Sequence, residues 1–168
     1  GLADDVESFR AALIAEGSEA ASVISAVSEM RRRLTEAKPP DGPWDAKQGP
    51  GRMLEIELIA QAGHLIAGAA ARDVASGLEA GVAIGWLSDA DSAALMRAYA
   101  LCWKVQMVAR LISEKPFEPH RLGEGGVAFL LRETKEESLE MLETRLGEIC
   151  AAAAQAIDGC LARAPKAS

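Results

Sequence analysis

The segment from Met53 to about residue 71 constrains the fold of this chain more than any other. Good helix-forming residues follow one another there without a break, and the Gly-Pro-Gly run at 49–51 marks where the helix begins. At about 100° per residue, apolar side chains cover nearly the whole circumference of this helix. A helix of this kind is buried at the centre of its domain, so the sequence predicts a helical core built around it.

The central helix has one narrow polar strip. Glu57, Gln61 and His64 follow one another at i, i+4 and i+7. Such a strip faces a partner, a cleft or a buried network, and we interpret it as a docking surface. The alternative is that it is simply the solvated side of the helix.

The other segments are also typical of helices. Alanine, leucine and glutamate abound and no run alternates with the period of a strand. We expect an all-α fold with a four-helix-bundle-like core and additional short helices, forming a single domain over 1–168. Besides the central helix, the expected helices are 3–15, 18–37 capped by Ser18, one short helix within 72–87, 88–113, 127–133, and a last helix capped by Thr134 with Glu137.

Charge and cysteine usage exclude several classes of protein. The net charge of −7 disfavours nucleic acid and an anionic membrane as partners. No apolar run approaches the roughly 20 residues of a membrane span, and the first residues are too polar for a signal peptide. Cys102, Cys150 and Cys160 lie in apolar helical surroundings and are interpreted as reduced core thiols of a cytoplasmic protein.

Several common motifs of catalytic and metal-binding sites are missing from the sequence. There is no H-E-x-x-H, no C-x-x-C, no nucleophile elbow, and the two histidines lie far apart, so we predict no catalytic residue and no metal site. Gly49-Pro50-Gly51 before a helix suggests a phosphate cradle, but the P-loop pattern is absent and a tight turn is the favoured interpretation.

Two groups of polar residues on helices have alternative interpretations. Gln106 and Arg110 lie on the aromatic side of the 88–113 helix, where they are either functional or the polar ends of side chains at a core edge. The basic run at 31–33 either complements the dipole of its helix or provides an arginine that contacts a phosphate or an adjoining domain.

The stretch D-A-K-Q-G-P-G-R-M-L-E-I-E-L-I-A-Q, residues 45–61, resembles the signature D-x-K-x-G-P-G-G-x-x-D-I-E-F-x-x-Q. That signature belongs to the helical domain that follows the nucleotidyltransferase domain in glutamine synthetase adenylyltransferase. The departures are Arg52 for Gly, Glu55 for Asp and Leu58 for Phe. The matching residues are Asp45, Lys47, Gly49, Pro50, Gly51, Ile56, Glu57 and Gln61.

Two other segments extend the resemblance over roughly residues 20 to 160. M-R-R-R-L, residues 30–34, is similar to an M-R-x-R segment of that family. A-Y-A-L-C-W-K-V-Q-M-V-A-R-L, residues 98–111, is similar to its A-Y-x-F-L-R-x-x-E-x-x-L helix, with Trp103 and Gln106 in place of Arg and Glu.

The resemblance implies a non-catalytic part of a larger enzyme. That enzyme family uses ATP and magnesium to adenylylate a tyrosine of glutamine synthetase, a second module reverses the reaction, and glutamine and the PII nitrogen-regulatory protein control it. The catalytic G-S and D-x-D motifs of the nucleotidyltransferase domain are absent here. We therefore expect a C-terminal fragment from the adenylylating module that is inactive by itself. The alternatives are the helical domain of the deadenylylating module and a free-standing, non-enzymatic helical adaptor.

The resemblance also suggests where this chain meets its partners. We expect the 44–51 loop and the polar strip to face the nucleotidyltransferase domain, with Lys47 meeting a phosphate or an acidic group. Glu55 is expected to be buried and paired with first-turn amides and with Arg52 or Lys47. The candidates for a domain interface or substrate cleft are Lys47, Arg52, Glu55, Glu57, Gln61, His64, Gln106 and Arg110.

Overall fold

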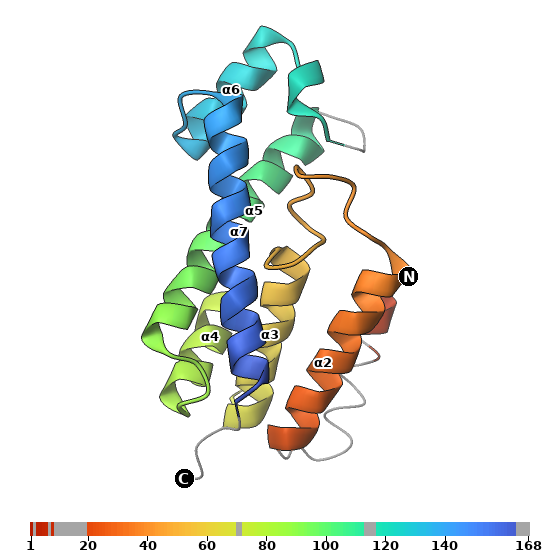
Figure 1. The fold of residues 1–168 in the computed structure, drawn as a ribbon, viewed down its shortest axis with the longest axis vertical. Coiled ribbons are helices and arrows are strands. Elements are labelled where there is room, and N and C mark those ends of the chain that lie inside the picture. Colours follow the sequence, from red (N-terminus) through yellow and green to blue (C-terminus); the bar gives the residue numbers. More distant parts are fainter. Residues whose placement is uncertain (2, 7, 9–19, 70–71, 113–116, 164–168) are drawn as a thin grey trace.

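Helices account for all the regular structure in the part of the chain that the computed structural model describes, namely residues 1, 3–6, 8, 20–69, 72–112 and 117–163 (Figure 1). This confirms the all-α expectation and packing of the bundle type. The helices are α2 (Ala20–Ala37), α3 (Met53–Ala67), α4 (Val74–Ala83), α5 (Asp89–Ile112), the 3-10 helix η1 (Pro119–Arg121), α6 (Glu124–Thr134) and α7 (Leu139–Leu161).

Helix α3 lies at the centre, as its apolar circumference predicts. It contacts α2, α4, α5 and α7, and α5 packs along α7 (Figure 1). The crossing of α3 and α4 is close because glycines occupy it. A Cβ atom on Gly63 would lie 2.2 Å from the Gly77 carbonyl oxygen, and one on Gly77 would lie 2.3 Å from the Ala60 oxygen. The glycines of the 72–87 region therefore allow two backbones to touch.

Several predicted boundaries differ from the structure. Helix α3 ends at Ala67 rather than near residue 71, because Gly68 adopts a left-handed conformation with φ 67° and the Ala69 amide bonds back to the His64 carbonyl. Helix α6 begins at Glu124, three residues earlier than expected, and η1 lies between the expected helices 88–113 and 127–133, where no helix was predicted.

The cap predicted for the last helix was wrong. Thr134 is the final residue of α6, and its buried hydroxyl donates to the Leu130 carbonyl. Helix α7 is instead capped by Ser138, whose side chain accepts from the Met141 amide. Both residues are hydroxyl-bearing, so only the packed structure distinguishes them. Most of the first predicted helix, together with its Ser18 cap for the second, falls outside the described residues, although 3–6 and 8 are helical.

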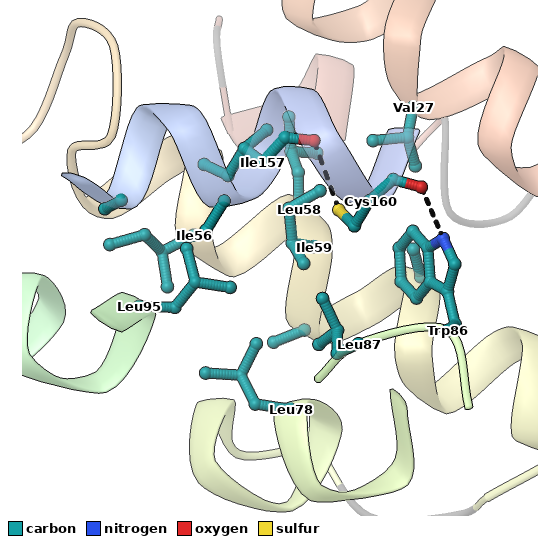
Figure 2. Packing of buried hydrophobic residues seen from close by; sticks show 14 of the residues in the cluster. Val27, Ile56, Leu58, Ile59, Leu78, Trp86, Leu87, Leu95, Ile157 and Cys160 are labelled. Atoms are coloured by element: carbon teal, nitrogen blue, oxygen red, sulfur yellow. Dashed lines mark hydrogen bonds between the residues drawn. The ribbon is translucent and has the colours of Figure 1, made fainter. Parts of the chain in front are cut away.

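The core forms two adjoining clusters along the bundle. In the first, Trp86 lies fully buried among aliphatic side chains of α3, α4, α5 and α7, and its indole nitrogen donates to the Cys160 carbonyl across 2.8 Å (Figure 2). The second surrounds Cys102 of α5 and Cys150 of α7, whose sulfur atoms lie 3.6 Å apart. All three cysteines are buried and free, as predicted.

Candidate functional site

The loop between α2 and α3 is held in one shape by a single carboxylate. Asp45 accepts hydrogen bonds from the backbone amides of Asp41, Lys47 and Gln48 at 2.9–3.1 Å. An Asx turn of this kind fixes a loop without regular secondary structure. The result is that Lys47 leaves the loop at a defined point beside the first turn of α3.

The Gly-Pro-Gly turn packs against α7. Gly51 has φ 68°, and a Cβ atom there would lie 2.0 Å from the Cys150 carbonyl oxygen, so only glycine fits. Its amide donates to Oε2 of Glu55 across 2.9 Å, and the Arg52 amide donates to the Gly49 carbonyl. Because these amides are already bonded within the turn, the turn interpretation holds and the phosphate-cradle interpretation does not.

Glu55 is buried and paired, as predicted, but its cationic partner is Arg31 of α2. The Arg31 Nε atom donates to Glu55 Oε1 at 2.8 Å, and its Nη1 atom reaches Asp158 of α7 at 2.5 Å. The expectation that Arg52 or Lys47 would pair with Glu55 was wrong, because Arg52 turns away and donates to the Asp45 carbonyl. The Glu55 network therefore joins α2, α3 and α7.

Four of the candidate residues surround one hollow. Lys47 from the loop, Glu57 from α3, and Gln106 and Arg110 from α5 line a space of about 410 Å³, which we call the loop-side hollow. Its apolar lining comes from Ala3, Val6, Met53 and Leu54. Lys47 and Gln106 are half-buried and Arg110 is exposed. The structure thus brings together residues that are up to 63 positions apart in the sequence.

Glu57 also borders a second space, of about 450 Å³, which we call the α4-side hollow. The Tyr99 hydroxyl donates to Glu57 Oε1 at 3.2 Å, and both residues line this hollow with Gln61 of α3. Its far end is formed by Arg72 and other residues just before and at the start of α4. Glu57 therefore stands between two hollows.

The electrostatics of Glu57 reflect this position. Partial burial raises the pKa of its carboxyl above the usual range, while the bond from Tyr99 and the nearby Lys47 ammonium oppose that rise. Burial, together with the Glu57 charge, raises the pKa of Tyr99 to about 12. The pair consequently stays hydrogen-bonded near neutral pH with the tyrosine protonated.

The remaining candidates lie elsewhere. His64 is buried, and its Nε2 atom lies 3.1 Å from the Asp73 carbonyl oxygen, so this nitrogen carries the proton. It belongs to a buried contact with the cap of α4 rather than to an open strip. Arg52 and Glu55 serve the turn and the α2–α3–α7 network. Of the predicted strip, Glu57 and Gln61 line the two hollows described above, and His64 lines neither.

Sequence reasoning did not single out Tyr99 or Arg72 as site residues, and it left Arg31 among three arginines. Arg32 and Arg33 bond to glutamates of their own helix, so Arg31 alone reaches other helices. Arg31 lies in the M-R-R-R segment and Tyr99 in the A-Y segment, and both segments resemble the family. This resemblance is the sequence signal that could have identified the two residues. Nothing in the sequence indicates Arg72.

Within the described ranges, no group of three His, Cys, Asp or Glu side chains lies close enough to hold a metal ion. In the same ranges, no helix is long and apolar enough to cross a membrane.

A family model and several known proteins are similar to this chain over most of its length. The family model described as GlnD PII-uridylyltransferase matches residues 25–145. Three similar proteins are each named bifunctional glutamine synthetase adenylyltransferase/adenylyl-removing enzyme. They come from Rhizobium meliloti (31% identical over 97% of this chain), Bartonella quintana (31% over 86%) and Rhodopseudomonas palustris strain TIE-1 (28% over 85%). The chain spans only 15–17% of the length of these relatives, and no solved structure matches it significantly.

Proposed function

Because this chain belongs to the GlnD PII-uridylyltransferase family, we propose that it is a non-catalytic helical domain of a glutamine synthetase adenylyltransferase. In this proposal it supports the ATP-dependent transfer of an adenylyl group to a tyrosine of glutamine synthetase. The relatives' names support an adenylyltransferase over a uridylyltransferase within this family, because each relative is named an adenylyltransferase.

The observation that carries the proposal is the grouping of Lys47, Glu57, Gln106 and Arg110 around the loop-side hollow. The loop, α3 and α5 contribute these residues, and all three contain parts of the segments that resemble the family. Clefts between domains are common places for ligand sites. We propose that this hollow and the 44–51 loop face the nucleotidyltransferase domain, where that domain binds ATP, magnesium and glutamine synthetase.

The other parts of the proposal follow from the same assignment. The catalytic carboxylates and the metal belong to the neighbouring domain, so this chain transfers no adenylyl group by itself. PII and glutamine act as regulators of the complete cytoplasmic enzyme. The relatives' names also include an adenylyl-removing enzyme. The alternative proposal is therefore that this chain is the helical domain of the module that removes the adenylyl group.

The test uses the complete polypeptide that contains this chain. We expect Lys47→Ala and Glu57→Ala to lower kcat/KM for adenylylation of glutamine synthetase by about tenfold or more, while the melting temperature of the 168-residue chain falls by no more than about 2 °C. Arg97→Ala, which removes an exposed cation of α5 outside both hollows, is the control.

Two results would count against the proposal. Parallel losses of stability in the isolated chain and of activity in the complete enzyme would mean that these residues only hold the bundle together. Transfer of label from ATP to glutamine synthetase by the isolated chain would contradict the non-catalytic assignment. A different outcome would select the alternative module: the two substitutions would lower removal of the adenylyl group from glutamine synthetase and leave its addition unchanged.

A further inference from the structure

The loop-side hollow is lined by two cations, Lys47 and Arg110, and by one carboxylate, Glu57. Neither Lys47 nor Arg110 forms an ion pair with any described residue, whereas Arg31, Arg32, Arg33 and Arg145 all do. The one carboxylate of the hollow, Glu57, already accepts the Tyr99 hydroxyl. Two cations beside one carboxylate leave an excess of positive charge in a chain of net charge −7, and this local excess favours an anionic group from outside.

Backbone amides are not available to bind that anion. The Met53 and Leu54 amides, at the start of α3, donate to the carbonyl oxygens of Ala46 and Lys47 at 3.3 and 3.1 Å. The Gly51 amide is taken by Glu55. A helix N-terminus with free amides is a ready phosphate site, but this one is closed by its own loop. Recognition in the hollow therefore depends on side chains.

The lining of the hollow contains apolar side chains, which a phosphate group by itself would leave without a partner. Half-buried Met53 and Leu54 lie beside the cations, and Val6 adds a further apolar group. Gln106 offers a neutral amide for hydrogen bonding. Apolar surface flanked by cations matches a peptide in which acidic and apolar side chains are close in sequence.

We propose that the loop-side hollow docks an acidic peptide segment that carries an apolar side chain, with its carboxylates on Lys47 and Arg110 and the apolar group against Leu54. This inference rests on the proposed function in one respect: the segment is assigned to the neighbouring nucleotidyltransferase domain. The docking chemistry itself is a property of the described residues.

The test titrates the 168-residue chain at low salt with the peptide acetyl-Glu-Leu-Glu-Glu-Leu-Glu-amide and follows backbone amide shifts by NMR. We expect shifts centred on Lys47, Leu54 and Arg110. The Kd should rise about tenfold or more in the Lys47→Met/Arg110→Met double variant and with the peptide in which glutamine replaces each glutamate. The matched control is Arg97→Met/Lys104→Met, which removes the same charge from the part of α5 outside the hollow and should change Kd less than twofold.

Other outcomes would overturn the inference. Equal weakening by the control variant would show nonspecific attraction between charges. Displacement of the peptide by inorganic phosphate, or binding of ATP at the same amides with no peptide binding, would assign the hollow to a phosphate. These measurements do not depend on enzyme activity. If the peptide does not bind but Lys47→Ala still lowers the activity of the complete enzyme as expected, the docking inference is refuted and the proposed function is retained.

Discussion

The hydroxyl of Tyr99 on α5 donates a hydrogen bond to the carboxylate of Glu57 on α3 across 3.2 Å. These two residues are 42 positions apart, and each lies in a segment that carries the family resemblance. Glu57 lines both hollows, and Tyr99 lines the α4-side hollow. A side-chain contact within the bundle thus also determines the geometry of the candidate site.

The first prediction uses the fact that Tyr99 is the only tyrosine of the chain. Absorbance at 295 nm should report its ionisation with a midpoint near the pKa of about 12, against roughly 10 in guanidinium chloride. Glu57→Gln should lower the native midpoint, because the adjacent negative charge is gone while the burial remains. A midpoint near 10 in the native wild-type chain would contradict the observed contact.

The same shift has a consequence for stability. The folded pKa of Tyr99 is raised above the unfolded one, so its contribution is complete below pH 10 and is lost as pH rises toward 12. Urea unfolding between pH 9 and 12 should show a steeper loss of stability in the wild type than in Tyr99→Phe. Identical pH profiles in the two proteins would count against the linkage.

The second prediction concerns the buried pair of Glu55 and Arg31. Glu55→Gln keeps the shape but removes the charge, and we expect the free energy of unfolding to fall by more than about 1 kcal/mol. Glu36→Gln breaks an exposed pair with Arg32 within α2 and should cost no more than about 0.5 kcal/mol. Chemical unfolding of both variants measures the two changes in the free energy of unfolding. Equal losses would mean that the Glu55–Arg31 pair contributes no more than an exposed ion pair.

The third prediction separates the two reasons for glycine at position 51. Gly51 and Gly68 have nearly the same positive φ, 68° and 67°, but a Cβ atom on Gly68 has no neighbour within 4 Å. Gly68→Ala should therefore cost only about 1–2 kcal/mol for the left-handed backbone. Gly51→Ala should cost about 1–3 kcal/mol more, because its Cβ atom collides with the Cys150 carbonyl. Similar melting temperatures for the two variants would show that the turn moves away from α7 easily.

The fourth prediction tests the hydrogen bond of the buried Trp86. Trp86→Phe leaves the Cys160 carbonyl without its indole donor, so we expect a loss of about 1–3 kcal/mol in the free energy of unfolding. Trp103 is half exposed, and Trp103→Phe should change stability by less than about 0.5 kcal/mol. If both variants unfold at the same denaturant concentration, the Trp86 bond makes no net contribution.

The sequence by itself determined the helices and the identity of the central one. Apolar side chains around the whole of α3 require it to be buried, whatever surrounds it. The burial of Glu55 followed from the same periodicity, because a carboxylate in an apolar arc must face the core. The segments resembling the family also marked Lys47 and Glu57 before any contact was known.

Only the tertiary structure decided which side chains meet. Periodicity assigns a residue to a face of its own helix but carries no information on the helix packed against that face. The choice of Arg31 over Arg52 or Lys47 for Glu55, and the burial of His64 away from Glu57 and Gln61, both depend on how α2 and α4 pack on α3. The loop-side hollow exists for the same reason, since it needs the loop, α3 and α5 to converge on one point.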